Sequence, residues 1–242
     1  MNKKGSPLQV AILLYPGVTA LDAVGPWEVL SRIPNAEIRF VGKEEGPVVT
    51  EGGALLLGIT HTTAETTSPD LVLVPGGITT PGQMVDDAVL DWLRKVHQTT
   101  RWTASVCTGA LILGAAGILK GSFATTHWYK MGVLRIMGAK PQPDERIVRS
   151  GKIVTAAGVS AGIDLAFWLA GEIAGREQAE AIQLIIEYDP HQPFDAGHMR
   201  KVSKQVQSLA RQMMDDSIPA DQRRLIPKIA WKRFIDLIRT GK

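Results

Sequence analysis

The only cysteine of this 242-residue chain, Cys107, lies in the segment TASVCTGALILG at positions 103–114. The residues before Cys107 are typical of a short buried strand, and those after it are typical of a tightly packed helix. A sharp strand-to-helix turn that presents a nucleophile needs small residues two positions before and two positions after it, because the backbone is crowded there. Ser105 and Gly109 occupy these two positions. The spacing therefore predicts a nucleophile elbow that holds the Cys107 thiol at the edge of a sheet.

Such a turn would place Cys107 at the N-terminus of a helix that begins near Thr108. The free N–H groups and the dipole of a helix N-terminus favour a thiolate. We therefore expect the pKa of the thiol to lie below the usual value of about 8.5, and we expect peroxide to oxidise it to sulfenic or sulfinic acid. The alternative is that Cys107 is a buried small hydrophobic residue, as most free cysteines are.

A second apolar run, DLVLVPGG at 70–77, ends in two glycines. Glycine lets bare backbone approach a ligand closely, which makes Gly76 a candidate pocket residue. An anionic intermediate on sulfur needs backbone N–H donors nearby. We expect the N–H groups of Gly77 and Thr108 to supply them, although the glycines also suit an ordinary tight turn.

Asp22 is an isolated carboxylate in the apolar segment TALDAVG. It is a candidate general acid beside the thiol, and the alternative is that it caps a helix starting at Ala23. Trp27, five residues further along, is the tryptophan that we expect closest to a pocket.

The order of the elements predicts the fold class. Strands are expected at 8–15, 36–42, 48–60 (a pair), 70–77, 102–106 and 146–158 (a hairpin), and helices at 19–33, 84–98, 108–121 and 160–175. This alternation is typical of an α/β protein with a mostly parallel sheet and helices on both faces. Ligands bind such sheets at the carboxyl ends of the strands. Three of these ends carry unusual residues, at Pro16-Gly17, Gly76-Gly77 and Cys107.

Composition excludes several classes of protein. The net charge of +3 forms no basic stripe of the kind that nucleic-acid binding needs, and no apolar stretch approaches the ~20 residues of a membrane span. The N-terminal MNKK followed by LQVAILLY resembles a signal peptide, but Pro16-Gly17 interrupts it, which favours a buried strand. A single cysteine cannot form an internal disulfide, so a reducing cytoplasm is the expected location. The five histidines are scattered without a zinc-binding pattern, so we expect no metal site.

The chain changes character near residue 190. We expect an α/β domain over 1–190 and a helical extension over 191–242, with amphipathic helices at 199–216 and 225–242. The extension is expected to pack on the domain or on a second subunit, and the alternative is a basic helix that binds acidic membranes or nucleic acid. Apolar faces in 177–190 and in the extension predict a symmetric homodimer.

Several motifs, taken in order, resemble the ThiJ/PfpI superfamily of class I glutamine-amidotransferase-like proteins, and most closely its isonitrile hydratase branch. They are TALDAVGPWEVL, VPGG, SVCTGALILGAAGILKGSFATTHW, AAGVSAGIDLAFWL and IIEYDPHQPFDAGH, which together span about residues 8–198. The resemblance implies a flavodoxin-like fold, a homodimer, Cys107 as nucleophile, Asp22 as its acid and Thr108 as a hydrogen-bonding neighbour. It also implies that Gly158 and Ser160 lie in a loop facing the site.

The activity implied by this resemblance is the hydration of a small-molecule isocyanide to an N-substituted formamide. Cys107 would attack the isocyanide carbon once the isocyanide is protonated, and water would hydrolyse the resulting thioimidate, with no metal or organic cofactor. Thr108 stands where the peptidase-like branch has a histidine, which argues against peptidase chemistry. Three alternatives remain: another cysteine enzyme of this fold, a redox sensor, or the ligand-binding half of a transcription regulator. The roughly fifty residues after position 190 are too few for that regulator's DNA-binding half. The sequence leaves open whether His127 takes part.

Overall fold

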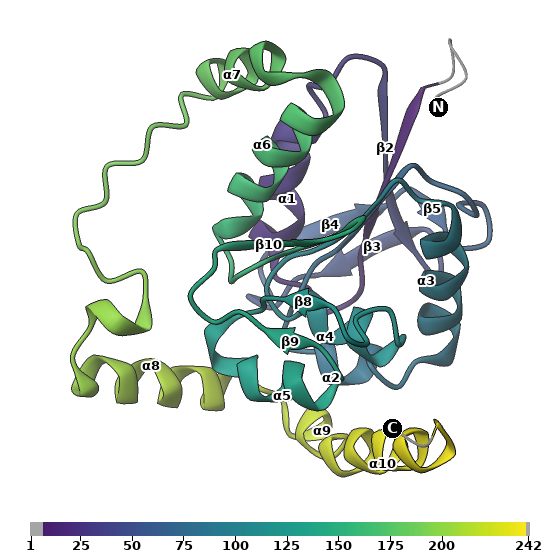
Figure 1. Cartoon of the computed structure of the whole chain (residues 1–242), viewed down its shortest axis with the longest axis vertical. Helices are drawn as coiled ribbons and strands as arrows, with labels where there is room; N and C mark the ends of the chain where they lie inside the picture. The colour runs from purple at the N-terminus through teal and green to yellow at the C-terminus, as the bar shows by residue number, and fades with distance from the viewer. Residues whose placement is uncertain (1–6, 241–242) are drawn as a thin grey trace.

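The computed structural model describes residues 7–240, which form a central sheet with helices on both faces (Figure 1). Within these residues the sheet has seven strands in the order β10-β11-β7-β6-β1-β2-β5. The strands are β1 (Leu8–Leu13), β2 (Ala36–Gly42), β5 (His61–Thr62), β6 (Leu71–Val74), β7 (Trp102–Ser105), β10 (Ile147–Ser150) and β11 (Ile153–Ala156). Two short ladders lie outside it, β3 (Gly46–Val49) with β4 (Leu56–Ile59) and β8 (Phe123–Ala124) with β9 (Lys140–Pro141). The expected fold class is therefore confirmed.

Neighbouring strands of the sheet are parallel except for the β10–β11 hairpin. The central strands read as continuous apolar runs because both of their faces are covered, and every residue of β6 and β7 is buried. After β1 the chain moves to β2 on one side, whereas after β6 it moves to β7 on the other side. The strand order thus reverses between β1 and β6, and the carboxyl ends at such a point form a natural ligand site.

Helices cover the two faces of the sheet and continue after residue 190. They are α1 (Ala20–Leu30), α2 (Thr80–Gln83), α3 (Asp87–Thr99), α4 (Gly109–Ala115), α5 (Met131–Ile136), α6 (Ala161–Ala174), α7 (Arg176–Ile185), α8 (Lys204–Ser217), α9 (Ala220–Arg223) and α10 (Ile226–Thr240), with 3-10 turns η1 (Trp128–Lys130) and η2 (Met199–Lys201). Helices α1 and α6 pack against each other on one face, and α3 and α4 pack against each other on the opposite face. Helix α4 is shorter than the expected 108–121, because the chain turns at Gly117 with a positive φ of 82°.

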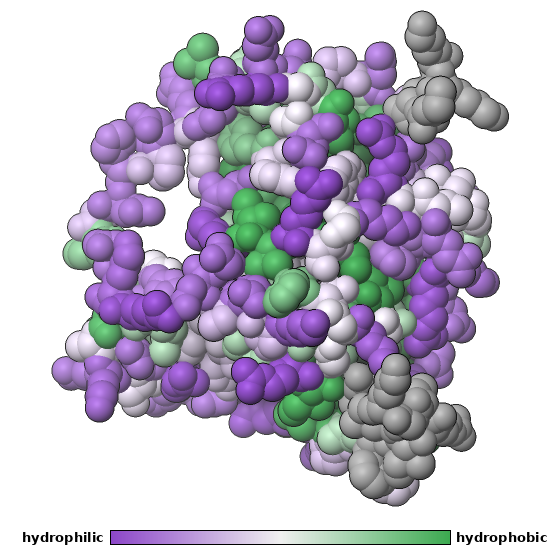
Figure 2. Space-filling model, in the orientation of Figure 1, coloured by the Kyte–Doolittle hydropathy of each residue, from purple (hydrophilic) through white to green (hydrophobic). Residues whose placement is uncertain are grey.

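After α7 an extended connection arches away from the sheet and returns to α8, which begins the yellow-green end of the chain in Figure 1. Figure 2 shows an opening enclosed by this arch and the body of the molecule. Helices α8–α10 lie below the sheet in Figure 1, near α2 and α5. Within residues 7–240, no helix combines the length and the apolar character that crossing a bilayer demands.

Candidate active site

Cys107 occupies a strained turn between β7 and α4. Its φ is +57°, a left-handed value that residues with a side chain seldom adopt. Two hydrogen bonds hold the turn: the Cys107 N–H donates to the Ala157 carbonyl at 3.0 Å, and the Thr126 hydroxyl donates to the Cys107 carbonyl at 2.7 Å. A Cβ on Gly109 would lie 1.9 Å from the Val74 carbonyl oxygen, so only glycine fits there. The turn has the strain and the close packing of a nucleophile elbow.

Asp22 lies in the first turn of α1 and is fully buried. Its Oδ2 accepts a 2.9 Å hydrogen bond from the Gly76 N–H, and the carboxyl lies close enough to the Cys107 thiol for the two groups to influence each other's pKa. Its Oδ1 is buried without a hydrogen-bond partner among the described residues. The capping alternative is wrong, because α1 begins at Ala20 after Thr19 and the Asp22 carboxyl bonds to a distant strand end.

The glycines after β6 allow these groups to meet. A Cβ on Gly76 would lie 2.4 Å from Thr108 Oγ1 and 3.1 Å from Asp22 Oδ2. The Gly77 N–H donates to Thr108 Oγ1 at 3.1 Å, and this hydroxyl also bonds to the Thr80 hydroxyl at 2.7 Å. The expectation of a free Gly77 donor therefore needs correction, because its N–H orients the Thr108 side chain. The Thr108 N–H acts to lower the pKa of the Cys107 thiol, and its role as a donor to an intermediate stays a prediction.

Burial reverses the expected effect on the pKa of the thiol. Cys107 is 5 % exposed, and desolvation, followed by the neighbouring Asp22 carboxylate, raises its pKa well above the usual value. The Thr108 N–H acts in the opposite direction but is outweighed. Desolvation also raises the pKa of Asp22 to about 8. The prediction of a lowered thiol pKa is therefore wrong, and at neutral pH both groups hold their protons.

A cavity of about 510 Å³ opens over Cys107. Its lining includes Thr108 and Gly77 near the sulfur, with apolar side chains over most of the remaining wall. His127 also lines it, is 8 % exposed, and has no hydrogen-bond partner at Nδ1 within the described part of the chain. Desolvation, with a contribution from Lys130, lowers the pKa of His127 to about 4, so the ring is neutral. The ring packs on Gly158, where a Cβ would lie 2.0 Å from Cδ2.

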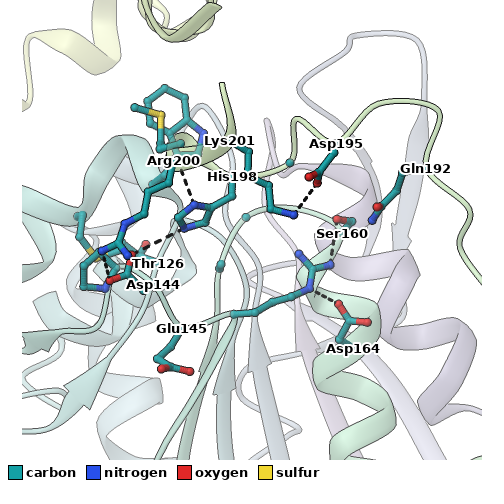
Figure 3. Close-up of a pocket in the computed structure, with 18 of the residues that line it drawn as sticks. Thr126, Asp144, Glu145, Ser160, Asp164, Gln192, Asp195, His198, Arg200 and Lys201 are labelled. Carbon is teal, nitrogen blue, oxygen red and sulfur yellow. Dashed lines mark hydrogen bonds and ion pairs between the residues drawn. The ribbon is translucent and has the colours of Figure 1, made fainter. Parts of the chain in front are cut away.

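Three residues that we expected at the Cys107 pocket, Gly158, Ser160 and Trp27, do not line the cavity over Cys107. Gly158 and Ser160 line a different cavity, of about 690 Å³, between the sheet edge and the connection that follows α7. Figure 3 shows Ser160 and Asp164 on one side of this cavity and His198 and Arg200 on the other. Ser160 precedes α6 but makes no capping hydrogen bond with its side chain, because its hydroxyl accepts from Arg146 at 3.2 Å.

Trp27 is half-buried and packs near Phe40, with ring centroids 6.4 Å apart, outside the lining of the Cys107 cavity. It therefore contributes to packing between α1 and β2. The position of Trp27 five residues after Asp22 did not indicate which face of α1 its side chain would occupy.

Two contributors to the cavity were missed by the sequence reasoning. Glu51 reaches the cavity from the loop after β3 and accepts a 2.6 Å hydrogen bond from the Thr19 hydroxyl. The second contributor is the C-terminal extension, which forms one wall of the cavity. The amphipathic pattern of its helices was the signal in the sequence that they pack on another surface. Among the described residues, no group of three or more His, Cys, Asp or Glu side chains is arranged to bind a metal ion.

Comparison with known proteins identifies the class to which this fold and site belong. A sequence profile of the DJ-1/PfpI family matches residues 8–172, and the chain belongs to this family. It is 43% identical to the isonitrile hydratase of Pseudomonas putida over 190 residues, which cover 78% of this chain and 82% of that protein. A crystal structure of a ThiJ/PfpI family protein from Pseudomonas syringae has a TM-score of 0.85 and 33% identity, covering 93% of this chain and 91% of that one. The transcriptional regulator CdhR of Pseudomonas aeruginosa is 29% identical over 69% of this chain, but only over 51% of its own length.

Proposed function

We propose that this protein hydrates organic isocyanides to N-substituted formamides, with Cys107 as nucleophile and Asp22 as proton carrier. The observation that carries the proposal is a buried carboxyl, Asp22, beside a buried thiol, Cys107, that lines an apolar cavity. The 43% identity to the Pseudomonas putida isonitrile hydratase supports the same reaction.

The first step forms a carbon–sulfur bond. The protonated Asp22 gives its proton to the terminal carbon of R–NC, which makes that carbon electrophilic, and the Cys107 sulfur attacks it. The thiol proton passes to the Asp22 carboxylate, so the carboxyl is protonated again at the end of the step. The product is a thioimidate, R–N=CH–S–Cys107, and the net change is addition of S–H across the isocyanide carbon.

The second step adds water. Asp22 protonates the thioimidate nitrogen and takes a proton from the attacking water, giving R–NH–CH(OH)–S–Cys107. This intermediate collapses by breaking the carbon–sulfur bond while its hydroxyl proton moves to the sulfur through the carboxyl. Formamide leaves and the free thiol returns, so the substrate, water, Cys107 and Asp22 supply every atom and electron pair.

The raised pKa of Asp22 suits this role, because a general acid must be protonated at the working pH. Thr108 supports the pair in two ways: its N–H favours the thiolate form of Cys107, and its hydroxyl is fixed by Gly77 and Thr80. A redox sensor is less well supported, because peroxide reacts with a thiolate and the pKa of this thiol is raised.

The proposal includes a symmetric homodimer in a reducing compartment such as the cytoplasm. Leu184 on α7 and Phe194 in the arch each expose 78 % of their surface, and Ile185 exposes 65 %. Large apolar side chains that are exposed in this way are typical of an interface. The reducing compartment follows from the scheme itself, which requires Cys107 as a free thiol.

Chromatography of p-tolyl isocyanide incubated with the protein tests the proposed activity. The wild-type protein is expected to give N-(p-tolyl)formamide, and folded Cys107→Ala is expected to match the rate without protein. Absence of formamide from several isocyanides in the presence of folded wild-type protein would refute the proposal.

A further inference from the structure

The C-terminal extension forms one wall of the cavity over Cys107. Met213 and Met214 of α8, Ile218 after it, and Ile226 and Ile229 of α10 line this wall. The family profile ends at residue 172, so these side chains lie outside the part of the chain that the profile describes. The catalytic pair and this wall thus belong to different parts of the chain.

Helix α8 is held against the domain beside the cavity. The Tyr129 hydroxyl donates to the Asp215 carboxylate, and the Arg211 guanidinium lies 5.2 Å from the centre of the Trp128 ring. A cation over an aromatic face and a hydrogen bond to a carboxylate both fix position. Both contacts flank Met213 and Met214 along α8; both methionines line the cavity, Met214 being half-buried and Met213 65% exposed.

Helices α9 and α10 are fixed on the other side. The Gly82 N–H in α2 donates to Gln222 Oε1 at 2.9 Å, and the Lys232 ammonium lies 2.6 Å from an Asp87 carboxylate oxygen. A Cβ on Gly82 would lie 3.1 Å from Gln222 Oε1, so the glycine lets α9 come close. The extension is therefore attached to the domain at both ends of the wall.

The domain side of the cavity is mainly apolar and also carries Glu51 and Lys130. Ile78, Leu111, Val133 and Val159 face the cavity from the domain. A cavity of about 510 Å³ with this lining favours an uncharged hydrophobic group of several carbon atoms, because each buried methylene adds to binding. Methionine is flexible and adapts to irregular shapes, which suits groups of different outline.

We infer that the C-terminal extension is the specificity wall of the active site and selects isocyanides with a bulky apolar group, such as cyclohexyl or aryl. This inference rests on the proposed function for its substrate. In it, the α/β domain supplies the chemistry and the extension contacts the R group.

The first test compares kcat/KM for cyclohexyl isocyanide and methyl isocyanide. The wild-type protein is expected to favour the cyclohexyl compound by at least about tenfold, the scale of discrimination by apolar pockets. Met214→Trp fills the space beneath α8 and is expected to lower this ratio roughly tenfold. Gln212→Trp places the same side chain on an exposed position of α8 and is expected to leave the ratio unchanged.

Hydration with a ratio that Met214→Trp does not alter would overturn the inference and leave the proposed function standing. If Met214→Trp does not fold, Ile218→Trp is the replacement, because Ile218 lines the same wall. The same tenfold fall in the ratio is expected from it.

A second test does not depend on hydration. Iodoacetamide and N-phenyliodoacetamide both alkylate a thiol with loss of iodide, and Cys107 is the only cysteine in the chain. Relative to glutathione, the phenyl reagent is expected to label wild-type Cys107 faster than iodoacetamide, and Met214→Trp is expected to remove this preference. If the phenyl reagent is preferred but the protein hydrates no isocyanide, the inference that the extension contacts an apolar group is supported and the proposed function is refuted. Equal labelling of wild-type protein by the two reagents would refute the inference that the extension selects apolar groups.

Discussion

At the scale of single residues, the Asp22–Cys107 pair combines two groups whose charged forms are both disfavoured by burial. Ser105 and Gly109 were sufficient to predict the nucleophile elbow, and the family resemblance indicated Asp22 as the acid. The direction of the thiol's pKa shift was not readable from the sequence. It depends on desolvation by residues from several strand ends, which outweighs the local effect of the helix N-terminus.

Asp22→Asn removes the proposed proton carrier and keeps the shape of the side chain. We expect turnover of an isocyanide to fall roughly 10²–10⁴-fold, the usual contribution of general acid–base catalysis. In the wild-type protein, turnover should decline as the pH rises through about 8, because Asp22 then loses its proton. A pH profile of kcat/KM measures both effects, and near-wild-type turnover by Asp22→Asn would contradict the assignment.

The same group makes stability depend on pH. Folding raises the pKa of Asp22 from 3.8 to about 8, so between these values the folded protein holds a proton that the unfolded chain has lost. Stability from this group therefore falls as the pH rises from about 4 to about 8. Denaturant titrations at pH 5 and pH 8 should show Asp22→Asn gaining stability relative to wild type as the pH rises. Asp189→Asn, at a carboxylate that is 91% exposed, is the control and should show no such gain.

At the scale of elements, the alternation of strand and helix patterns was sufficient to predict the sheet and the carboxyl-end location of the site. The position of Trp27 and the use of the Gly77 N–H were not predictable, because packing between distant segments decides them. The early end of α4 has a local cause, the turn at Gly117. Ser160 illustrates the limit: its sequence position suits a cap, but Arg146 engages its hydroxyl.

The elbow is sensitive to one methyl group at Gly109. A Cβ there would lie 1.9 Å from the Val74 carbonyl oxygen, so Gly109→Ala must displace β6 from α4. We expect a loss of roughly 1–3 kcal/mol or more in unfolding free energy. Gly132→Ala on α5 meets open space and should be neutral or stabilising, because alanine favours helix. Equal denaturation midpoints for the two variants would contradict the packing described for the elbow.

At the scale of the whole molecule, the segment after residue 190 packs on the rest of the chain and lines the Cys107 cavity. The sequence predicted the first of these two features but not the second. Amphipathic patterning predicted that the extension would pack on something. It did not indicate the Cys107 cavity, because the contact of Gln222 with Gly82 joins segments 140 residues apart in the chain.

The exposed apolar side chains of α7 and the arch predict a dimer of about twice 26.2 kDa. Light scattering at micromolar concentration measures this mass directly. Replacing Leu184 and Phe194 by glutamate should shift the mass toward one chain, because two charges at an interface core are costly to bury. A wild-type monomer at that concentration would contradict the proposed assembly.

The most direct test of the proposed chemistry is capture of the covalent intermediate. Wild-type protein mixed with p-tolyl isocyanide, reduced with borohydride within one turnover and weighed intact should gain the mass of the isocyanide plus two hydrogens. Digestion should place this mass on Cys107, and Cys107→Ala should show none. Formamide production at the wild-type rate by Cys107→Ala would show that the hydration does not pass through this thiol, and would contradict the account.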